Sequence, residues 1–274
     1  MAITAAIIVH NEEHRVEDCL RCLTWCDDIV VFDKLSDDRT REICRRYTDH
    51  IITIPWIDFR PEENQFVIDH VQTEWVLGVT ASDLVTPALA IQIRSLIDQP
   101  DFPFDVIQVP FLNYALGMSG LHSPWHFPHK PLVFRTRVFR FRPDSVHQAV
   151  YFDSDRFFQI PFSEHACIYH LTHESIDGLM DRHIRYCHTE ADRFPPDRSL
   201  REPFWAILRA FLGVLIRRRS WVMGWNGIAL GLAYLTYPIL RYLYIWEKRN
   251  SQATSRYQEI RDLILQERQQ PPNG

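Results

Sequence analysis

The sequence contains almost no lysine. Three of its thirty basic residues are lysines, namely Lys34, Lys130 and Lys248. Arginine suits bidentate contacts with phosphate, but a genome rich in G and C produces the same bias, and we favour that explanation. The sequence also shows no secretory signal at Met1, because an apolar, β-rich run begins at once. We therefore expect a reducing compartment and free thiols.

The cysteines lack a second cluster that would complete a zinc site. Cys19, Cys22 and Cys26 are three and four residues apart in a helical pattern, which places them on one stripe with Leu23. Without further ligands, they are predicted to pack as small buried hydrophobic residues.

Basic charge is concentrated at the C-terminal end. The chain has 274 residues, 46% of them hydrophobic, which is enough to bury a substantial core. Its formal net charge is −5, but residues 201–274 carry eleven Lys and Arg against five acidic residues, which leaves −11 for residues 1–200. The basic end is a candidate surface for anionic lipid, whereas the acidic body argues against binding of nucleic acid.

Apolar strands alternate with amphipathic helices, which predicts an α/β fold with a mostly parallel, doubly wound sheet. The predicted strands are 2–10, 28–33, 51–54, 74–79, 105–110, 132–135 and 165–171. The predicted helices are 11–25, 39–47, 61–71, 87–97 and 172–191, the last with Thr172 as its N-cap.

The stretch 76–87 is the one around which the chain is organised. An apolar run predicts a buried strand, Thr80, Ser82 and Asp83 follow at its carboxyl end, and Thr86-Pro87 supplies a helix N-cap and first helical position. Ligands of open α/β sheets bind outside the carboxyl ends of parallel strands, so these polar side chains are candidates for contact with phosphate or a metal. An ordinary strand-to-helix loop is the alternative.

Four motifs, in this order and spacing, resemble those of family 2 glycosyltransferases. They are Ile7–Glu13, Asp28–Asp33 with Ser36–Thr40, Asn64-Gln65, and Trp75–Asp83. The whole pattern, from residue 3 to about residue 249, is most similar to bacterial lipopolysaccharide-core and related cell-envelope sugar transferases. The resemblance implies a GT-A fold, which is Rossmann-like, and a nucleotide-sugar as donor.

The resemblance also implies a donor site at the strand ends. By position, Asn11 and Glu12 border the nucleoside, Asp33 accepts a hydrogen bond from the base, and Asp38 lies in the adjoining loop, with Gln65 in the same set. An ionised carboxylate in a partly buried crevice can accept such bonds. For Asp38, capping of the helix that follows it is the alternative.

Two arginines match a basic helical segment of the family. Arg182 and Arg185 are assigned to the surroundings of the donor diphosphate. Their alternative is a solvated helix surface, which is where charged helix faces usually lie.

The chain departs from the family pattern after the fourth strand. The family usually has Asp-Ala-Asp-Glu there, and carboxylates of that motif hold a divalent metal against the diphosphate; this chain has Thr80-Ala81-Ser82-Asp83. Hydroxyls are poor ligands for a hard cation, so we expect at most a weak Mg or Mn site at Asp83. Other positive groups in place of the metal, or loss of transfer activity, are the alternatives.

A second departure affects the expected catalytic base. The family signature Val-His-Glu is Val146-His147-Gln148 in this chain. An amide cannot take a proton, so Gln148 is predicted to position the acceptor and His147 becomes the candidate base, with an ordinary pKa of about 6.5.

The stretch 111–129 is rich in aromatic residues, glycine and histidine, a composition typical of sugar sites. Its histidines raise a further alternative, a metal site in which imidazoles replace the missing carboxylates. The candidate ligands are His122, His126, His129, His147, His170 and His173. Pro124 and Pro128 argue against a regular helix there.

The C-terminal part is predicted to be helical and to associate with membranes. Pro195-Pro196 separates a catalytic domain, 1–194, from an amphipathic region, 195–249, and a charged helix and tail, 250–274. The apolar pattern 221–246 is long enough to cross a bilayer, which needs about 20 residues, but Gly224, Pro238 and Arg241 make it a poor crossing. Together with Arg217–Arg219, its aromatic residues favour an interfacial hairpin. A helical appendage packed on the catalytic domain is the alternative.

These features predict a glycosyltransferase that is cytoplasmic and peripheral on the inner membrane, and that moves a sugar from a nucleotide-sugar to a cell-envelope glycolipid or polysaccharide. The resemblance implies a single inverting displacement. Two alternatives stay open: a catalytically impaired relative that binds a nucleotide-sugar or a partner at the membrane, and a histidine-liganded metalloprotein on the same scaffold.

Overall fold

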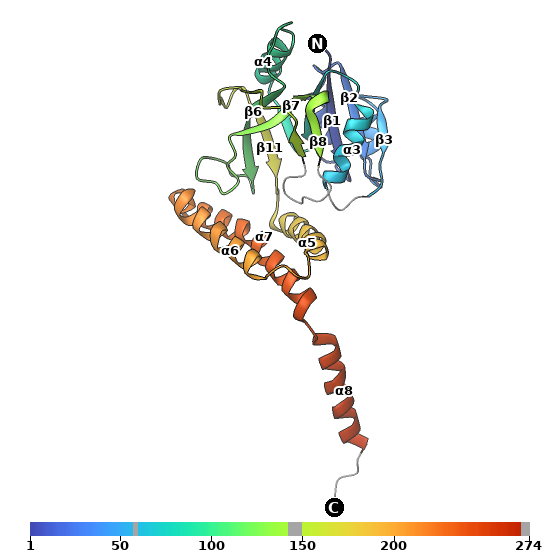
Figure 1. Cartoon of the computed structure of the whole chain (residues 1–274), viewed down its shortest axis with the longest axis vertical. Coiled ribbons are helices and arrows are strands. Elements are labelled where there is room, and N and C mark those ends of the chain that lie inside the picture. Colours follow the sequence, from blue (N-terminus) through green and yellow to red (C-terminus); the bar gives the residue numbers. More distant parts are fainter. Residues whose placement is uncertain (57–59, 142–149, 270–274) are drawn as a thin grey trace, which may run out of the picture.

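A nine-stranded mixed sheet forms the centre of the computed structural model, which describes residues 1–56, 60–141 and 150–269 (Figure 1). Its strand order is β3-β2-β1-β4-β7-β6-β11-β5, with β10 beside β6. The strands are β1 (Ile3–Val9), β2 (Asp28–Asp33), β3 (Ile51–Thr53), β4 (Trp75–Thr80), β5 (Asp83–Val85), β6 (Val106–Ala115), β7 (His129–Arg135), β10 (Phe157–Gln159) and β11 (Ile168–Thr172). A two-stranded sheet joins β8 (Phe139–Phe141) and β9 (Val150–Phe152).

Helices flank the sheet and follow it. They are α1 (Val16–Arg21), α2 (Thr40–Cys44), α3 (Arg60–His70), α4 (Pro87–Ile97), α5 (Ile176–Arg193), α6 (Arg201–Leu212), α7 (Gly224–Asn250) and α8 (Ala253–Gln269). Short 3-10 helices cover Thr136–Val138 and Ser220–Met223, and a π-helical turn covers Gly213–Arg217. The predicted α/β class, with a C-terminal helical part, is confirmed.

The register of the strands brings their carboxyl ends to one edge. The four strands β3, β2, β1 and β4 run parallel, and β7 is antiparallel to both β4 and β6. Because β11 is parallel to β6, the ends of β1, β2, β4, β6 and β11 all lie on the same side. Asp33 pairs with Val9 and Thr80 with Ile8, so polar residues of three strands reach this edge together.

The apolar runs of the sequence form the central strands, whose side chains are buried in the core. Every residue of β1 except Ile8 is buried, and β2 is buried from Ile29 to Asp33, as expected of central strands covered on both faces. Cys19 lies in the same core beside Leu20 and Leu23, which confirms its predicted packing.

Two predicted helix starts are wrong. The first helix begins at Val16 rather than residue 11, because Asn11 has a left-handed φ of 52° and turns the chain before the helix. The start of α5 is capped by Ser175, whose Oγ accepts the Gly178 N–H at 3.1 Å, and not by Thr172. In contrast, α4 begins at Pro87 as predicted, with the Thr86 hydroxyl accepting from the N–H of Leu89.

Four of the described strands, β5, β8, β9 and β10, have no counterpart in the prediction, and β5 is the one beside the candidate site. The residues Asp83–Val85 form β5, which pairs antiparallel with β11. The segment after β4 is therefore part of the sheet and not a free loop.

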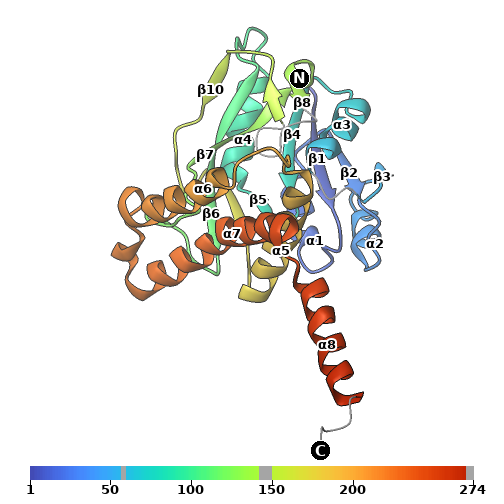
Figure 2. The ribbon, with the colours of Figure 1, turned by 60° about the horizontal axis from the view of Figure 1, so that its bottom comes forward.

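The helices α6 and α7 form a hairpin beside the carboxyl edge of the sheet, and α5 leads into it from β11 (Figure 2). The turn of this hairpin is tight: a Cβ at Gly227 would lie 1.7 Å from the carbonyl oxygen of Ser220. Ser220 also donates to the His122 carbonyl at 2.7 Å, which fastens the turn to the loop between β6 and β7.

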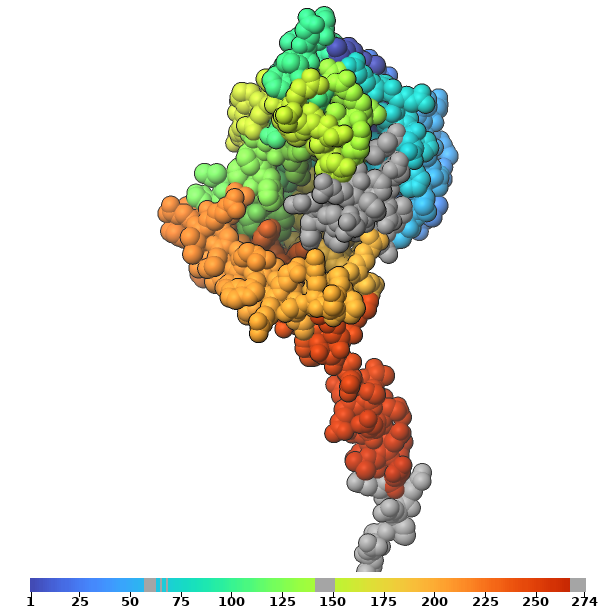
Figure 3. Space-filling view, in the orientation of Figure 1, coloured from blue at the N-terminus to red at the C-terminus, as the bar shows by residue number. Residues whose placement is uncertain are grey.

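The hairpin leaves much apolar surface exposed. Trp225 is 84% exposed, and Trp205, Ile216 and Trp221 are each more than half exposed. Among the described residues, one helical stretch, Ser220–Asn250, has the length and hydropathy of a membrane-spanning helix. The last helix, α8, stands clear of the rest of the chain and its described side chains are exposed (Figure 3).

Candidate active site

The end of β2 places a buried carboxylate at the sheet edge. Asp33 is fully buried, and its Oδ1 accepts the N–H of Ser36 at 3.2 Å. Its Oδ2 lies 3.5 Å from Nε of Arg41 but accepts no hydrogen bond from the described residues. Buried polar atoms are normally paired, so this oxygen is suited to accept a hydrogen bond from a ligand.

Asn11, at the end of β1, is held by the loop that follows β2. Its amide nitrogen donates to Asp37 Oδ1 at 2.6 Å, and its amide oxygen accepts the Asp37 N–H at 3.0 Å. Its own N–H donates to the Ser36 hydroxyl at 3.0 Å. These bonds fix the two strand ends relative to each other, so Asn11 shapes the wall of the site.

Asp38 has a capping role in the structure. Its Oδ1 accepts the N–H of Thr40 at 2.8 Å, and its Oδ2 accepts the N–H of Glu13 at 3.1 Å. Burial acts to raise the pKa of this carboxyl group, but the hydrogen bonds from Thr40 and Glu13 outweigh it and lower the pKa. The nearby Glu12 carboxylate is paired with Arg15 at 2.5 Å.

Sequence reasoning missed an aromatic group beside this edge. Trp56 follows β3, and its ring centroid lies 4.4 Å from that of His10, edge to face. The Lys34 ammonium lies 4.4 Å from the Trp56 centroid, and the Arg185 guanidinium lies 5.8 Å from it. Cations at these distances are attracted to an aromatic face. The signal in the sequence was a lysine directly after β2 and an aromatic residue three residues after the end of β3.

Arg185 thus comes from α5 to the same edge as the ends of β1 and β2. Arg182, one turn earlier, instead donates from Nη1 to the Thr172 hydroxyl at 3.1 Å. The structure brings the predicted basic helix face to the strand ends, so it is more than a remote solvated surface.

Asp83, after β4, has hydrogen-bond partners from the protein on both of its carboxylate oxygens. Its Oδ2 accepts both the N–H of Thr80 at 2.7 Å and the Thr80 hydroxyl at 2.9 Å. Its Oδ1 lies 2.7 Å from Nδ1 of His170 in β11. The Ser82 hydroxyl, 3.0 Å from that of Thr80, completes the cluster. These contacts join β4 to β11.

This cluster does not fit a divalent metal. Both oxygens of Asp83 already have partners, and hydroxyls are weak ligands for hard cations. Nowhere in residues 1–56, 60–141 and 150–269 do three or more His, Cys, Asp or Glu side chains converge as a metal site would require. The weak-metal role of Asp83 stays a prediction that the contacts do not favour.

The predicted histidine metal site is not formed by the histidines that the structure describes. His122 donates from Nδ1 to the Arg218 carbonyl at 2.6 Å, and His129 donates from Nε2 to the Ile160 carbonyl at 2.9 Å. His170 is bound to Asp83. Backbone carbonyls and one carboxylate hold these rings apart from one another.

The side chains of three predicted site residues are not described by the structure. His147 and Gln148 lie outside the described residues, and so does the side chain of Gln65, although its backbone belongs to α3. Their roles stay predictions.

The sequence is similar to bacterial glycosyltransferases. It is 22% identical over 261 residues to an uncharacterized glycosyltransferase of Rickettsia bellii (strain RML369-C), covering 87% of this chain and 84% of the relative. It is 26% identical over 106 residues to the lipopolysaccharide core biosynthesis glycosyltransferase LpsC of Rhizobium meliloti, covering 37% and 39% of the two chains. The chain is a glycosyltransferase, and its motifs resemble those of family 2.

No family model matches this glycosyltransferase. Among solved structures, S. aureus TarS in complex with UDP is 14% identical with a TM-score of 0.48, covering 92% of both chains. Glucosyl-3-phosphoglycerate synthase from Mycobacterium tuberculosis, solved with Mn2+, UDP and glucosyl-3-phosphoglycerate, is 12% identical with a TM-score of 0.45, covering 70% of this chain and 79% of that one.

Proposed function

We propose that this glycosyltransferase transfers a sugar from a nucleotide-sugar to a cell-envelope glycolipid or polysaccharide. The observation that carries the proposal is the Asp33 carboxylate, which is buried at the end of β2, and whose Oδ2 lies 3.5 Å from Nε of Arg41 but accepts no hydrogen bond from the described residues. A base N–H is a donor of the kind that this oxygen can accept. The similarity to LpsC supports a cell-envelope acceptor.

The donor nucleoside lies between the ends of β1 and β2 in this proposal. Asn11 and Glu12 border it, and Asp38 holds their loop in place through the Glu13 N–H. The Trp56 ring, next to His10, offers an aromatic surface at the rim of the same edge.

Cationic side chains take the diphosphate. Arg185 lies against Trp56, and Arg182 is one turn from it on α5. Lys34, on the same ring, is paired with the buried carboxylate of Glu63 and borders the site rather than supplying an uncompensated charge. Guanidinium groups bind phosphate oxygens by paired N–H donors and stabilise the charge that grows on a leaving diphosphate. Thr80 and Ser82 contribute through the cluster that holds Asp83 and His170 in place, and no metal is needed for these contacts.

The reaction is a single displacement with inversion. The acceptor hydroxyl attacks the anomeric carbon, its proton passes to a base, and the bond from that carbon to the diphosphate breaks with the electron pair leaving on the diphosphate. We assign the base to His147 and the positioning of the acceptor to Gln148 from the sequence motif.

We also propose that the α6–α7 hairpin lies in the surface of the inner membrane, on the cytoplasmic face. Exposed Trp221 and Trp225 are close in sequence to Arg217–Arg219, a combination suited to anionic lipid headgroups. A spanning role for α7 is disfavoured, since Arg241 of this helix is paired with Glu190 of α5 and the two helices are packed together.

Binding and hydrolysis of UDP-, GDP-, ADP- and CMP-sugars by the full chain, measured with and without EDTA, test the proposal. We expect one nucleotide class to bind saturably, with turnover that survives EDTA. Absence of binding by all four classes would refute a donor site at this edge. Binding without hydrolysis or transfer across a panel of lipid acceptors would favour the non-catalytic alternative.

A further inference from the structure

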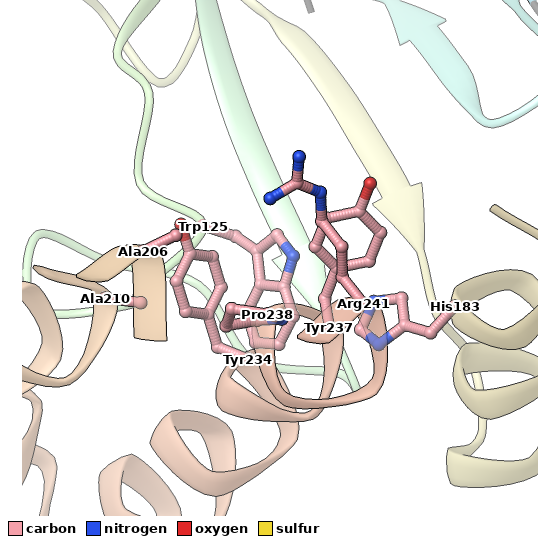
Figure 4. A pocket seen from close by; sticks show the side chains of 8 residues that line it. All are labelled: Trp125, His183, Ala206, Ala210, Tyr234, Tyr237, Pro238 and Arg241. Atoms are coloured by element: carbon pink, nitrogen blue, oxygen red, sulfur yellow. The ribbon is translucent and has the colours of Figure 1, made fainter. Parts of the chain in front are cut away.

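A cavity of about 320 Å³ lies between the catalytic part and the helical hairpin (Figure 4). Trp125, from the loop between β6 and β7, and His183 of α5 form one side of it. Ala210 of α6 and Tyr234, Tyr237 and Arg241 of α7 also line it. No residue of the donor site described above lines this cavity.

One end of the cavity is aromatic. The rings of Trp125 and Tyr234 have centroids 5.2 Å apart and lie edge to face, at 86° to each other. Figure 4 shows both rings at the end that also holds Ala210. Such rings offer apolar faces to the C–H groups of a sugar ring.

The other end is polar and offers a hydrogen-bond acceptor. The Thr236 hydroxyl donates to the Ala233 carbonyl at 2.7 Å, so its oxygen accepts from Nδ1–H of His183 at 2.8 Å. Because the ring proton is on Nδ1, Nε2 of His183 carries a lone pair. Burial and the nearby Arg182 lower the pKa of His183 to about 4, so the ring is neutral at neutral pH.

The same end also offers a cationic donor. Arg241 meets Glu190 through its Nε at 2.5 Å, and the Tyr237 hydroxyl donates to the same carboxylate. In Figure 4 the guanidinium group of Arg241 lies beside the Tyr237 ring, at the end where His183 is found. A sugar hydroxyl both donates and accepts, so the neutral imidazole and the guanidinium group together suit it.

A second cavity, between α6 and α7, has the lining expected of a site for hydrocarbon and serves as a comparison. It measures about 280 Å³, and Phe204, Phe211 and Leu235 are among a lining made of apolar side chains alone. The first cavity differs from it by the polar groups at one end, which would lose their hydrogen bonds to water against a hydrocarbon chain.

We infer that the cavity between Trp125 and Arg241 binds the sugar ring of the acceptor. This inference rests on the proposed function and names the substrate group recognised beside the hairpin. At about 320 Å³, the cavity is at the small end of the range of about 300–1,000 Å³ found for ligand pockets. It therefore takes a saccharide head group, while the lipid part of a glycolipid stays with the exposed apolar surface of α6 and α7.

The decisive variant fills the cavity without removing any polar contact. Ala210→Phe places a ring in the space, and Leu212→Phe adds a ring to the same helix at an exposed residue that lines neither cavity. Binding of methyl glycosides of glucose, galactose, mannose and glucuronic acid is measured by saturation-transfer NMR on the full chain in a sugar-free zwitterionic detergent. We expect at least one glycoside to bind, and Ala210→Phe to weaken it more than tenfold while Leu212→Phe leaves it unchanged.

A second pair of variants tests the lone pair on His183. His183→Phe keeps a ring but removes Nε2, and we expect glycoside affinity to fall about tenfold, the usual effect of one lost hydrogen bond. Thr236→Val removes the same internal hydrogen bond but keeps the imidazole, so it controls for loosened packing and should reduce affinity less. Equal losses in the two variants would overturn the assigned contact.

Nucleotide binding, measured on the same samples, separates this inference from the proposed function. If a nucleotide binds but none of the four glycosides does, or if Ala210→Phe and Leu212→Phe bind glycoside equally, the acceptor assignment fails alone. If octanol displaces a bound glycoside competitively, the cavity is a hydrocarbon site and the inference also fails. Absence of nucleotide binding would instead count against the donor site.

Discussion

Asp33, the last residue of β2, and Asp83, the first residue of β5, are two buried carboxylates with different sets of partners. Both are at most 3% exposed. Asp83 is surrounded by donors from its own chain, whereas Asp33 keeps one oxygen without a hydrogen bond from the described residues. A buried carboxylate with all its hydrogen bonds made stabilises the fold, whereas the Oδ2 of Asp33 faces the Arg41 guanidinium at 3.5 Å and can still accept a hydrogen bond. The comparison supports our proposal that the donor binds at the ends of β1 and β2 rather than at the position of the missing acidic motif.

The largest expected effect is on stability, from Asp83→Ala. This change leaves the Thr80 N–H, the Thr80 hydroxyl and His170 without their common acceptor, so we expect the free energy of unfolding to fall by about 3 kcal/mol. Urea denaturation followed by circular dichroism measures it. A loss below about 1 kcal/mol would show that Asp83 is not the structural member of the pair.

The next largest expected effect is a pH dependence of stability that comes from the buried imidazole of His183. His183 has a folded pKa of about 4 and an unfolded pKa of about 6.5, so the unfolded chain binds more protons between these values. Stability contributed by this group is present above pH 6.5 and is lost as the pH falls toward 4. At pH 5 we expect the wild type to have lost about 2 kcal/mol from this residue relative to pH 7.

His183→Phe should remove that part of the pH dependence, whereas His188→Phe, at an exposed residue of the same helix, should keep it. Urea denaturation at both pH values gives the comparison. The same pH slope in both variants would contradict the burial of a neutral imidazole.

A smaller effect on stability and a larger one on ligand binding are expected for Asp33→Asn. The amide retains an oxygen for the Ser36 N–H but replaces the other oxygen by a donor, which a base N–H cannot use. Nucleotide affinity should fall about tenfold or more, with little change in unfolding. Fluorescence titration reports the affinity. If Asp83→Asn, in folded protein, lost more affinity than Asp33→Asn, the comparison would be reversed.

The smallest expected effect concerns the membrane and leaves both carboxylates unchanged. Trp221→Ala combined with Trp225→Ala should weaken binding to vesicles of anionic phospholipid about tenfold, because two exposed aromatic surfaces are lost. Tyr257→Ala, on α8, is the control and should bind like the wild type. Sedimentation of the vesicles at low and high salt measures the binding. If all of the wild type stayed in the supernatant at low salt, without sedimenting with the vesicles, this would count against a membrane-bound hairpin.

The sequence predicted best those elements that depend on local chemistry. The strand β2 and the helix α4 have the predicted bounds, since an uninterrupted apolar run and a Thr86-Pro87 start need no distant partner. The α/β class followed from the alternation of such elements. The start of α1 was missed because contacts between Asn11 and Asp37 of another loop fixed the turn.

The site was predictable in part for the same reason. The resemblance pointed to Asp33 at the end of a predicted strand, but the lack of a hydrogen bond at its Oδ2 depends on how distant side chains pack around it. The group formed by Trp56, Lys34 and Arg185 joins residues from three separate segments, so no spacing in the sequence could indicate it. The contact between Asp83 and His170 likewise depends on the pairing of β11 with β5.

The link between Ser220 and the His122 carbonyl has a geometric consequence. It joins the turn of the hairpin to the loop that carries Trp125. On a hairpin seated in a leaflet, the catalytic edge would thus be held at a constant height above the lipid. Acceptors would then be sorted by the reach of their glycan as well as by its chemistry.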